Sequence, residues 1–176
     1  MIRIAIFLMI IFPIGLYSAI PEACDFKVVD KFQNKYFQKV QCRPYQRLML
    51  RELMRYYKDQ ELIDILHELK NEYLIDDTLI QEKYGIIAVI FERRGNIKKA
   101  MEYAELSASA GSSSYYSSIA HYSMACYNVR QENPSKAIEN LKKSFELASF
   151  QVRDAISDEC FKPLKNLPEY RQLISA

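Results

Sequence analysis

The chain has 176 residues, of which 49% are hydrophobic and 26% are charged, with only 4 Gly and 6 Pro. This composition excludes a disordered or collagen-like chain and is typical of an ordered, helical protein with one core or a short array of repeats. The formal net charge of +2 produces no strong long-range field, so nucleic acid and acidic surfaces are not expected partners.

Residues 1–19 are typical of a signal peptide. Arg3 supplies the positive end, Ile4–Ile14 form an apolar run, and Ala19 offers a small residue for cleavage. The apolar run is short for a membrane span, which needs about 20 residues. We therefore expect an exported protein, periplasmic or at the cell surface, that is mature from about residue 20. An uncleaved N-terminal anchor and a lipoprotein with Cys24 at its new N-terminus are the alternatives.

The four cysteines can form disulfides if the protein is exported, because an oxidising compartment permits such bonds. The sequence leaves their pairing open, since Cys24, Cys42, Cys126 and Cys160 allow three arrangements. A Cys24–Cys42 bond requires the intervening segment to fold back, because a straight helix would separate the two by about 27 Å. Cys126 lies beside a small position of a repeat helix, where a cysteine is expected to act as a small core residue.

Residues 20–43 form an N-terminal segment of uncertain structure. Apolar residues from Val28 to Val40 recur at spacings of three and four, which favours an amphipathic helix. Tyr36–Gln41 also fits a short strand. We expect this segment to precede the helical domain and to be one of the candidates for covering its exposed end.

Residues 44–176 are expected to form one helical domain. Pro44 suits the first turn of a helix that ends near Lys58, and Asp59 is a suitable N-cap for a second helix. Because the connection between them is very short, these two helices should form an antiparallel hairpin.

The next two helices have clear boundary signals. Thr78 and Gln81 have the spacing of a capping box, so a third helix is expected to begin there and to reach Arg93. Gly95 supplies a left-handed residue that ends this helix, and Asn96 is expected to cap the fourth.

Glycine, serine and proline residues delimit the remaining helices. Gly111 is expected to close the fourth helix, and Ser112–Ser114 offer caps for the fifth. Asn133–Pro134 is an N-cap followed by proline at the first helical position, which predicts a sixth helix. A short helix near Val152–Ile156 follows, before two prolines break the tail into short pieces.

A pattern of large apolar and small residues repeats with a period of 37 residues. It comprises Tyr84, Ile87, Ala88, Phe91, Gly95 and Ala100, and four of these positions recur as His121, Met124, Ala125 and Ala137. One period earlier, Ile63 falls in the second helix of the first hairpin. Three helical hairpins at one period are the signature of a solenoid, in which each hairpin buries its apolar face against the next.

Residues 84–111 resemble a tetratricopeptide repeat (TPR) unit, through the residues just named together with Ala104. Residues 121–173 resemble the terminal unit of bacterial TPR arrays, whose more specific motif is matched by Asp158, Phe161, Pro163–Leu164 and Pro168–Glu169–Tyr170. The resemblance implies an all-α fold of antiparallel helix pairs in a short right-handed solenoid over residues 44–176. A Sel1-like array, which has a similar hairpin and a slightly longer period, is the alternative.

In TPR-like folds the first helix of each pair lines a concave groove that holds a peptide or protein partner. Carried over to this chain, the resemblance implies the groove residues Glu82, Val89, Glu92, Arg93, Tyr122, Cys126, Val129 and Arg130, with Tyr45, Glu52, Arg55 and Tyr56 from the weaker first unit. Tyrosine and arginine are enriched at binding hot spots. Packing between hairpins is the competing interpretation for each residue. The TPR mode that holds a C-terminal carboxylate through Lys and Asn is not expected, because the corresponding positions hold other residues.

No sequence pattern indicates catalysis, a metal site or a cofactor. The only histidines are His67 and His121, and His121 occupies a packing position of its repeat. No serine lies in a G-x-S-x-G motif, and the four glycines form no phosphate-binding loop. We therefore predict an exported, non-catalytic protein-protein interaction module. An envelope-assembly or structural protein acting through other surfaces is one alternative. A small exported enzyme with a site between the N-terminal segment and the first hairpin is the other, and a pocket that brings His67 close to a cysteine or an acid would favour it.

Overall fold

A computed structural model of the chain describes residues 43–71, 74, 76–149 and 151–175. These residues form helices and connecting turns without a strand, which confirms the all-α prediction. None of the described helices is long and apolar enough to cross a membrane. The signal peptide and the helix or strand expected in residues 20–43 fall almost wholly outside the described part.

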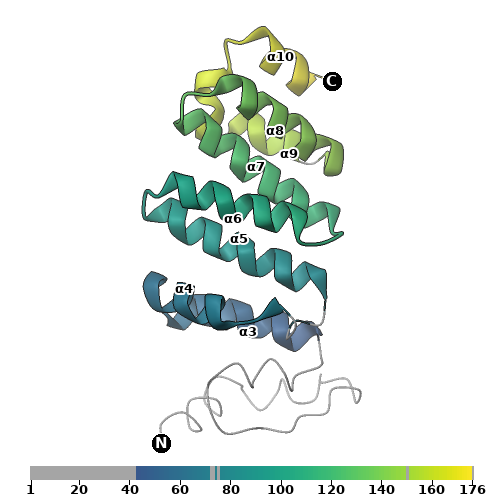
Figure 1. Cartoon of the computed structure of the whole chain (residues 1–176). Coiled ribbons are helices and arrows are strands. Elements are labelled where there is room, and N and C mark those ends of the chain that lie inside the picture. The colour runs from purple at the N-terminus through teal and green to yellow at the C-terminus, as the bar shows by residue number, and fades with distance from the viewer. Residues whose placement is uncertain (1–42, 72–73, 75, 150, 176) are drawn as a thin grey trace, which may run out of the picture.

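Nine helical elements follow one another in the described part of the chain. They are α3 (Arg43–Tyr56), α4 (Asp59–Glu68), α5 (Asp77–Arg93), α6 (Ile97–Ser109), α7 (Ser114–Arg130), α8 (Pro134–Leu147), α9 (Gln151–Ser157), the 3-10 helix η3 (Glu159–Leu164) and α10 (Pro168–Ser175). In Figure 1 these elements lie across a column and succeed one another along it, from α3 and α4 at one end to α10 at the other. The six helices from α3 to α8 are those predicted from the sequence.

Three of the predicted helix boundaries are confirmed in detail. Gly95 has a φ angle of +74°, the left-handed conformation that ends α5 and that a glycine adopts without strain. Asn96 caps α6, because its side chain accepts a hydrogen bond from the backbone N–H of Lys99. Asn133 caps α8 in the same way, and Pro134 is the first residue of that helix.

Two predicted N-caps of the earlier helices are wrong. Lys58 occupies the N-cap position of α4, so Asp59 is already inside the helix, where its carboxylate faces α5 instead. The N-cap of α5 is Asp76, whose side chain accepts a hydrogen bond from the backbone N–H of Leu79. Thr78 and Gln81 therefore form no capping box, because a better acceptor precedes them.

Gln81 is fully buried and organises the turn between α6 and α7. Its Oε1 atom accepts from the backbone N–H of Ser113 at 3.2 Å, and its Nε2 atom donates to Ser117 Oγ at 3.0 Å. Ser113 lies at the predicted N-cap of α7 but makes no capping bond with its own side chain. The amide of Gln81 on α5 instead holds the start of α7 through the backbone N–H of Ser113 and the hydroxyl of Ser117.

Gly111 does not close α6, which ends at Ser109 with Ala110 as its C-cap. It lies in the following turn, where it approaches the first residue of α5. A Cβ atom on Gly111 would lie 2.6 Å from the Cβ atom of Asp77 and 2.9 Å from its carbonyl oxygen. Only glycine fits this approach without movement of the backbone, so its role is close packing between neighbouring pairs.

The apolar interior consists of two clusters. The first fills the space between α3, α4, α5, α6 and α7, with Leu50, Leu66, Leu79 and Ile87 fully buried. The second joins α7 and α8 to the tail, where Phe161, Leu164 and Tyr170 are buried against Leu141. The Tyr170 hydroxyl donates to the carbonyl oxygen of Ala155 at 2.8 Å. The tail motif found in the sequence thus supplies the core at this end of the column.

A disulfide joins Cys126 of α7 to Cys160 of η3, with the two Cα atoms 5.7 Å apart. Cys126 is buried, as predicted, but the expectation that it acts only as a small core residue is wrong, because it is covalently paired. The bond spans 34 residues of sequence and ties the tail to α7. A pairing of Cys24 with Cys42 lies outside the described residues.

Replacement of Gly111 by alanine should destabilise the protein by about 1–3 kcal/mol, because the added Cβ atom overlaps Asp77. Gly85 provides a matched control inside α5, since a Cβ atom there would meet Ser107 Oγ at an ordinary 3.6 Å. Gly85→Ala should stabilise the protein by about 0.5–1 kcal/mol. Urea unfolding of both variants measures the difference, and equal effects would contradict the proposed role of Gly111.

Removal of the described disulfide should lower the free energy of unfolding by about 3–4 kcal/mol, the chain-entropy value for a loop of this length. The variant Cys126→Ala/Cys160→Ser leaves the other two cysteines unchanged and is compared with the wild type without reductant. Urea unfolding followed by circular dichroism gives the two stabilities. Equal stabilities would show that the bond does not constrain the unfolded chain.

Candidate functional site

Most of the predicted groove residues lie on α5 and α7, and the structure shows what each of them contacts. α3, α5 and α7 lie side by side, because Glu82 of α5 contacts Arg47 of α3 and Tyr116 of α7. We call the surface shared by these three helices the α3–α5–α7 face. The second helices form another layer, in which His67 of α4 meets Tyr103 of α6.

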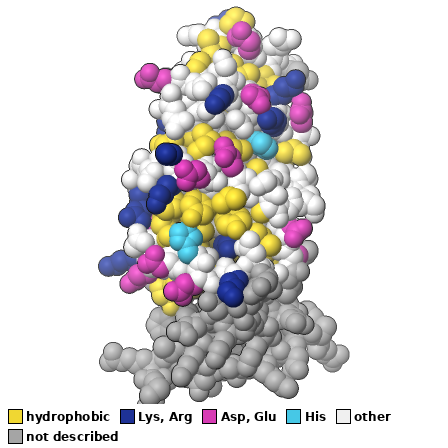
Figure 2. Space-filling view, viewed as in Figure 1, with side chains coloured by type: hydrophobic (Ala, Val, Ile, Leu, Met, Phe, Trp, Pro, Cys, Tyr) yellow, Lys and Arg dark blue, Asp and Glu magenta, His cyan; other side chains and the backbone are white. Residues whose placement is uncertain are grey.

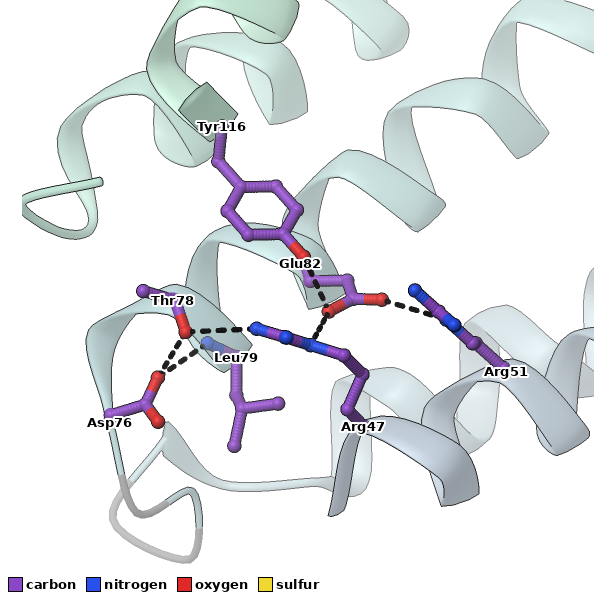
Figure 3. Close-up of polar contacts among 7 residues, drawn as sticks. All are labelled: Arg47, Arg51, Asp76, Thr78, Leu79, Glu82 and Tyr116. Carbon is purple, nitrogen blue, oxygen red and sulfur yellow. Dashed lines mark hydrogen bonds and ion pairs between the residues drawn. The ribbon is translucent and has the colours of Figure 1, made fainter. Parts of the chain in front are cut away.

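Glu82 lies at the centre of a polar cluster, shown in Figure 3. Its carboxylate accepts from Arg47 Nε at 3.1 Å and from the Tyr116 hydroxyl at 2.9 Å, while Arg51 Nε lies 3.8 Å away. Burial, followed by the hydrogen bond to Glu82, raises the pKa of Tyr116 to about 12. Glu82 is therefore mainly a contact between neighbouring pairs, although it was predicted to face a partner.

Arg47 extends this cluster to the start of α5. Its Nη2 atom donates to Thr78 Oγ1 at 3.4 Å, and the Thr78 hydroxyl donates to the carboxylate of Asp76. The same Asp76 carboxylate caps α5 through Leu79. A chain of hydrogen bonds thus connects the helix cap to α3, which orients the Arg47 guanidinium group.

Glu92 and Arg130 contact each other across α5 and α7. Arg130 Nη2 lies 2.9 Å from the Glu92 carboxylate, which also accepts from the Tyr127 hydroxyl at 3.2 Å. Tyr127 is fully buried, and this burial, reinforced by the nearby Glu92 charge, raises the pKa of its phenol. Glu92 and Arg130, which were both predicted to line the groove, therefore hold α7 against α5.

Arg93 and Tyr122 also join neighbouring helices. Arg93 Nη2 lies 2.7 Å from a carboxylate oxygen of Asp59, the residue that opens α4. The Tyr122 hydroxyl donates to Asp158 at 2.9 Å, and its ring meets Phe161 edge to face at 5.1 Å between centroids. Burial, then the bond to Asp158, raises the Tyr122 pKa. For Tyr122 the packing interpretation is therefore the better one.

Five of the contacts between successive pairs have similar separations in sequence. Bonds from Arg47 to Glu82, Arg93 to Asp59, Tyr116 to Glu82, Tyr127 to Glu92 and Tyr122 to Asp158 all span 34 to 36 residues. The disulfide spans 34 residues as well. These contacts therefore join residues slightly less than one 37-residue period apart.

Val89 is the predicted site residue that remains exposed and apolar, with 40% of its surface accessible. It lies two helical turns after Glu82 on the same face of α5. Ile119 of α7 is 37% exposed and occupies the position one 37-residue period after Glu82. Sequence reasoning missed Ile119, although the period itself marked its position. Val129 is half-buried against the second core, and the side chain of Tyr56 lies outside the described residues.

Lys83 is buried without a carboxylate among its described hydrogen-bond partners. Its Nζ atom donates to the carbonyl oxygen of Leu69 at 2.8 Å and to Asn71 Oδ1 at 2.6 Å, and lies 4.8 Å from the centroid of the Tyr84 ring. Desolvation lowers its pKa to about 8. The amine thus binds the end of α4, a role that its place among the buried positions of α5 could have indicated.

An aromatic group lies on the opposite layer. The Tyr103 ring stacks on His67 and Phe91, at 5.6 and 5.5 Å between centroids, and its hydroxyl lies 2.6 Å from His67 Nε2. Figure 2 shows hydrophobic side chains gathered beside a histidine on this surface. His121 is separate from this group and contacts Asn140 at 3.0 Å.

No protein-family model, curated protein or solved structure matches this chain. The resemblance to TPR units therefore stays a prediction from the sequence pattern.

The lowered pKa of Lys83 predicts a specific pH dependence of stability. The folded-state pKa of about 8 lies below the unfolded value of 10.5, so the unfolded chain binds more protons between these values and the stability contribution of this group rises with pH. The difference in stability between the wild type and Lys83→Met should change by up to roughly 1.4 kcal/mol per pH unit between pH 8 and 10. Urea unfolding at several pH values measures it, and parallel curves would refute the assignment.

Proposed function

We propose that this chain is an exported, non-catalytic, TPR-like right-handed solenoid that binds a peptide or protein partner on its α3–α5–α7 face. Several contacting side chains are 34 to 36 residues apart, close to the 37-residue period of the sequence pattern. This supports the repeat, because each unit of a solenoid packs against the next. The short connections between successive helices support the antiparallel pairing.

The observation that carries the binding proposal is the exposure of Val89 and Ile119 on a face whose charged groups are largely paired. Glu82, Glu92 and Arg130 hold helices together and are only secondarily available to a partner. Isolated apolar residues on a surface are common, but Val89 and Ile119 lie on the same face of two neighbouring helices, and we call them the apolar strip. We infer that this strip contacts the partner's apolar side chains.

Export is supported by two features. Residues 1–19 have the composition of a signal peptide, and α7 is linked to η3 by a disulfide, a bond that persists in oxidising compartments. The proposal therefore assigns the protein to the periplasm or the cell surface, where its partner should be another exported protein or an exposed segment of a membrane protein.

A second candidate function is assembly through the opposite layer. His67 and Tyr103, with Leu106 44% exposed one turn further along α6, offer an alternative docking surface there. This candidate corresponds to the envelope-assembly alternative and makes a different prediction about which side of the molecule touches a partner.

Site-specific photo-crosslinking in the producing cells tests both candidates. A benzophenone amino acid at position 89 or 119 should yield a discrete crosslinked product of one mass, since both positions lie on the proposed binding face. The same residue at position 106 is the matched control, because Leu106 is equally exposed on the other layer. Products from position 106 alone would favour assembly through the opposite layer, and no discrete product from position 89 or 119 would overturn the proposal.

Variants then test the contribution of the strip. Val89→Asn combined with Ile119→Asn should abolish the captured product while leaving the protein folded, because neither side chain is buried. Leu106→Asn, the control of similar exposure, should leave capture unchanged. Circular dichroism melting curves verify that all three proteins are folded.

A further inference from the structure

Positive charge is concentrated on one helix of the binding face. α3 contains four arginines spaced four residues apart, Arg43, Arg47, Arg51 and Arg55, and a single acidic residue, Glu52. We call these four residues the arginine row. α4 has the opposite character, with four acidic residues and no lysine or arginine. Although the total charge of the chain is near neutral, α3 is therefore positively charged and α4 is negatively charged.

Two members of the arginine row share one carboxylate, which can neutralise only one positive charge. Glu82 accepts from Arg47 at 3.1 Å and also from Tyr116, and it is only 12% exposed. Arg51 Nε lies 3.8 Å from the same carboxylate, at the edge of the cluster in Figure 3. The other acid of this cluster, Asp76, already accepts from Thr78 and from the backbone of Leu79.

Arg51 consequently keeps donors for another anion. Its side chain is 66% exposed, and the long ion pair with Glu82 engages only the Nε side of the guanidinium group. A guanidinium fork binds a carboxylate through two parallel hydrogen bonds, with greater geometric specificity than a lysine provides. Glu82 and Arg47 restrict the neighbouring part of the row, so this fork is presented from an ordered surface.

We infer that the partner segment is an acidic peptide whose carboxylate binds Arg51 while its apolar side chains lie on Val89 and Ile119. This inference rests on the proposed function and specifies the chemistry of the partner. It also revises the expectation drawn from net charge, which excluded acidic surfaces, because the relevant charge is local to α3. The mode differs from the Lys and Asn carboxylate site of TPR proteins, since the donor is an arginine of α3.

The remainder of the face favours a peptide over a polyanion. Glu82 and Glu92 of α5 pair with Arg47 and Arg130, so the face offers separate guanidinium groups and not the continuous positive surface that nucleic acid or an anionic membrane binds. A peptide can place isolated carboxylates at Arg51 and apolar groups over the rest of the strip. α7, on the far side of α5, contains no Asp or Glu, so it adds no further repulsion to an acidic segment.

Fluorescence anisotropy with defined peptides tests the inference. The probe is a fluorescein-labelled, C-terminally amidated peptide of three Glu-Leu-Ser-Gly repeats, compared with peptides carrying Gln or Lys in place of Glu. The Glu peptide should bind more tightly than the Gln peptide by at least threefold at low salt, and the Lys peptide should not bind. Added salt should weaken the Glu peptide alone, because the difference is electrostatic.

Substitutions at Arg51 show whether this residue is responsible. Arg51→Glu should reduce affinity for the Glu peptide by roughly five- to tenfold, and Arg51→Lys should retain part of it, because the charge remains without the fork. Lys142→Glu is the matched control, an equal charge reversal at an exposed position of α8. Arg51→Ala replaces the reversal variant if a melting curve shows that Arg51→Glu is unfolded.

Three results would overturn the inference. The first is equal affinity for the Glu and Gln peptides, and the second is an equal loss of Glu-peptide affinity in Arg51→Glu and Lys142→Glu. The third is Arg51-dependent binding of phosphatidylglycerol vesicles or of a 12-nucleotide single strand in preference to the Glu peptide. None of them bears on the crosslinks from positions 89 and 119, which decide the proposed function separately. Arg51-dependent preference for the Glu peptide supports the inference.

Discussion

A carboxylate withdrawn from water must be paired, and this constraint organises the stack of helices. Glu82 and Glu92 of α5 both meet it through side chains of neighbouring pairs: α3 and α7 supply arginine and tyrosine donors to Glu82, and α7 supplies both donors to Glu92. Because the donors come from different helices, displacement of any one pair would leave a charge without its partners. The central helix α5 thereby determines how its neighbours are spaced and rotated.

The same pairing decides which side chains remain for binding. The repeat pattern assigns several charged residues to a groove, but in this protein they join successive helix pairs. Few of their donors and acceptors are therefore left for a partner. What remains on the α3–α5–α7 face is apolar, at Val89 and Ile119, together with the exposed guanidinium of Arg51. Recognition of a partner would then depend on shape and apolar contact, with one directed charge to select the segment.

Local features of the fold were predictable because they depend on a few consecutive residues. Gly95, Asn96 and Asn133–Pro134 each satisfy a helix end within one turn, so their effect is visible without knowledge of the rest of the chain. The capping box at Thr78 failed because Asp76 caps the helix two residues earlier, which places Thr78 inside its first turn. Gln81 was misassigned for a related reason, since its true partners lie more than 30 residues away.

The sequence by itself determined the helical class and the positions of the six central helices, because hydrophobic spacing and caps act within single helices. Tertiary structure alone decided the cysteine partner of Cys126 and the close approach of Gly111 to Asp77. It also decided which side chains form hydrogen bonds with Glu82, Glu92 and Tyr122. Each of these depends on the rotation of one helix against another. A shift of one residue in that register would change every contact, and no local pattern encodes it.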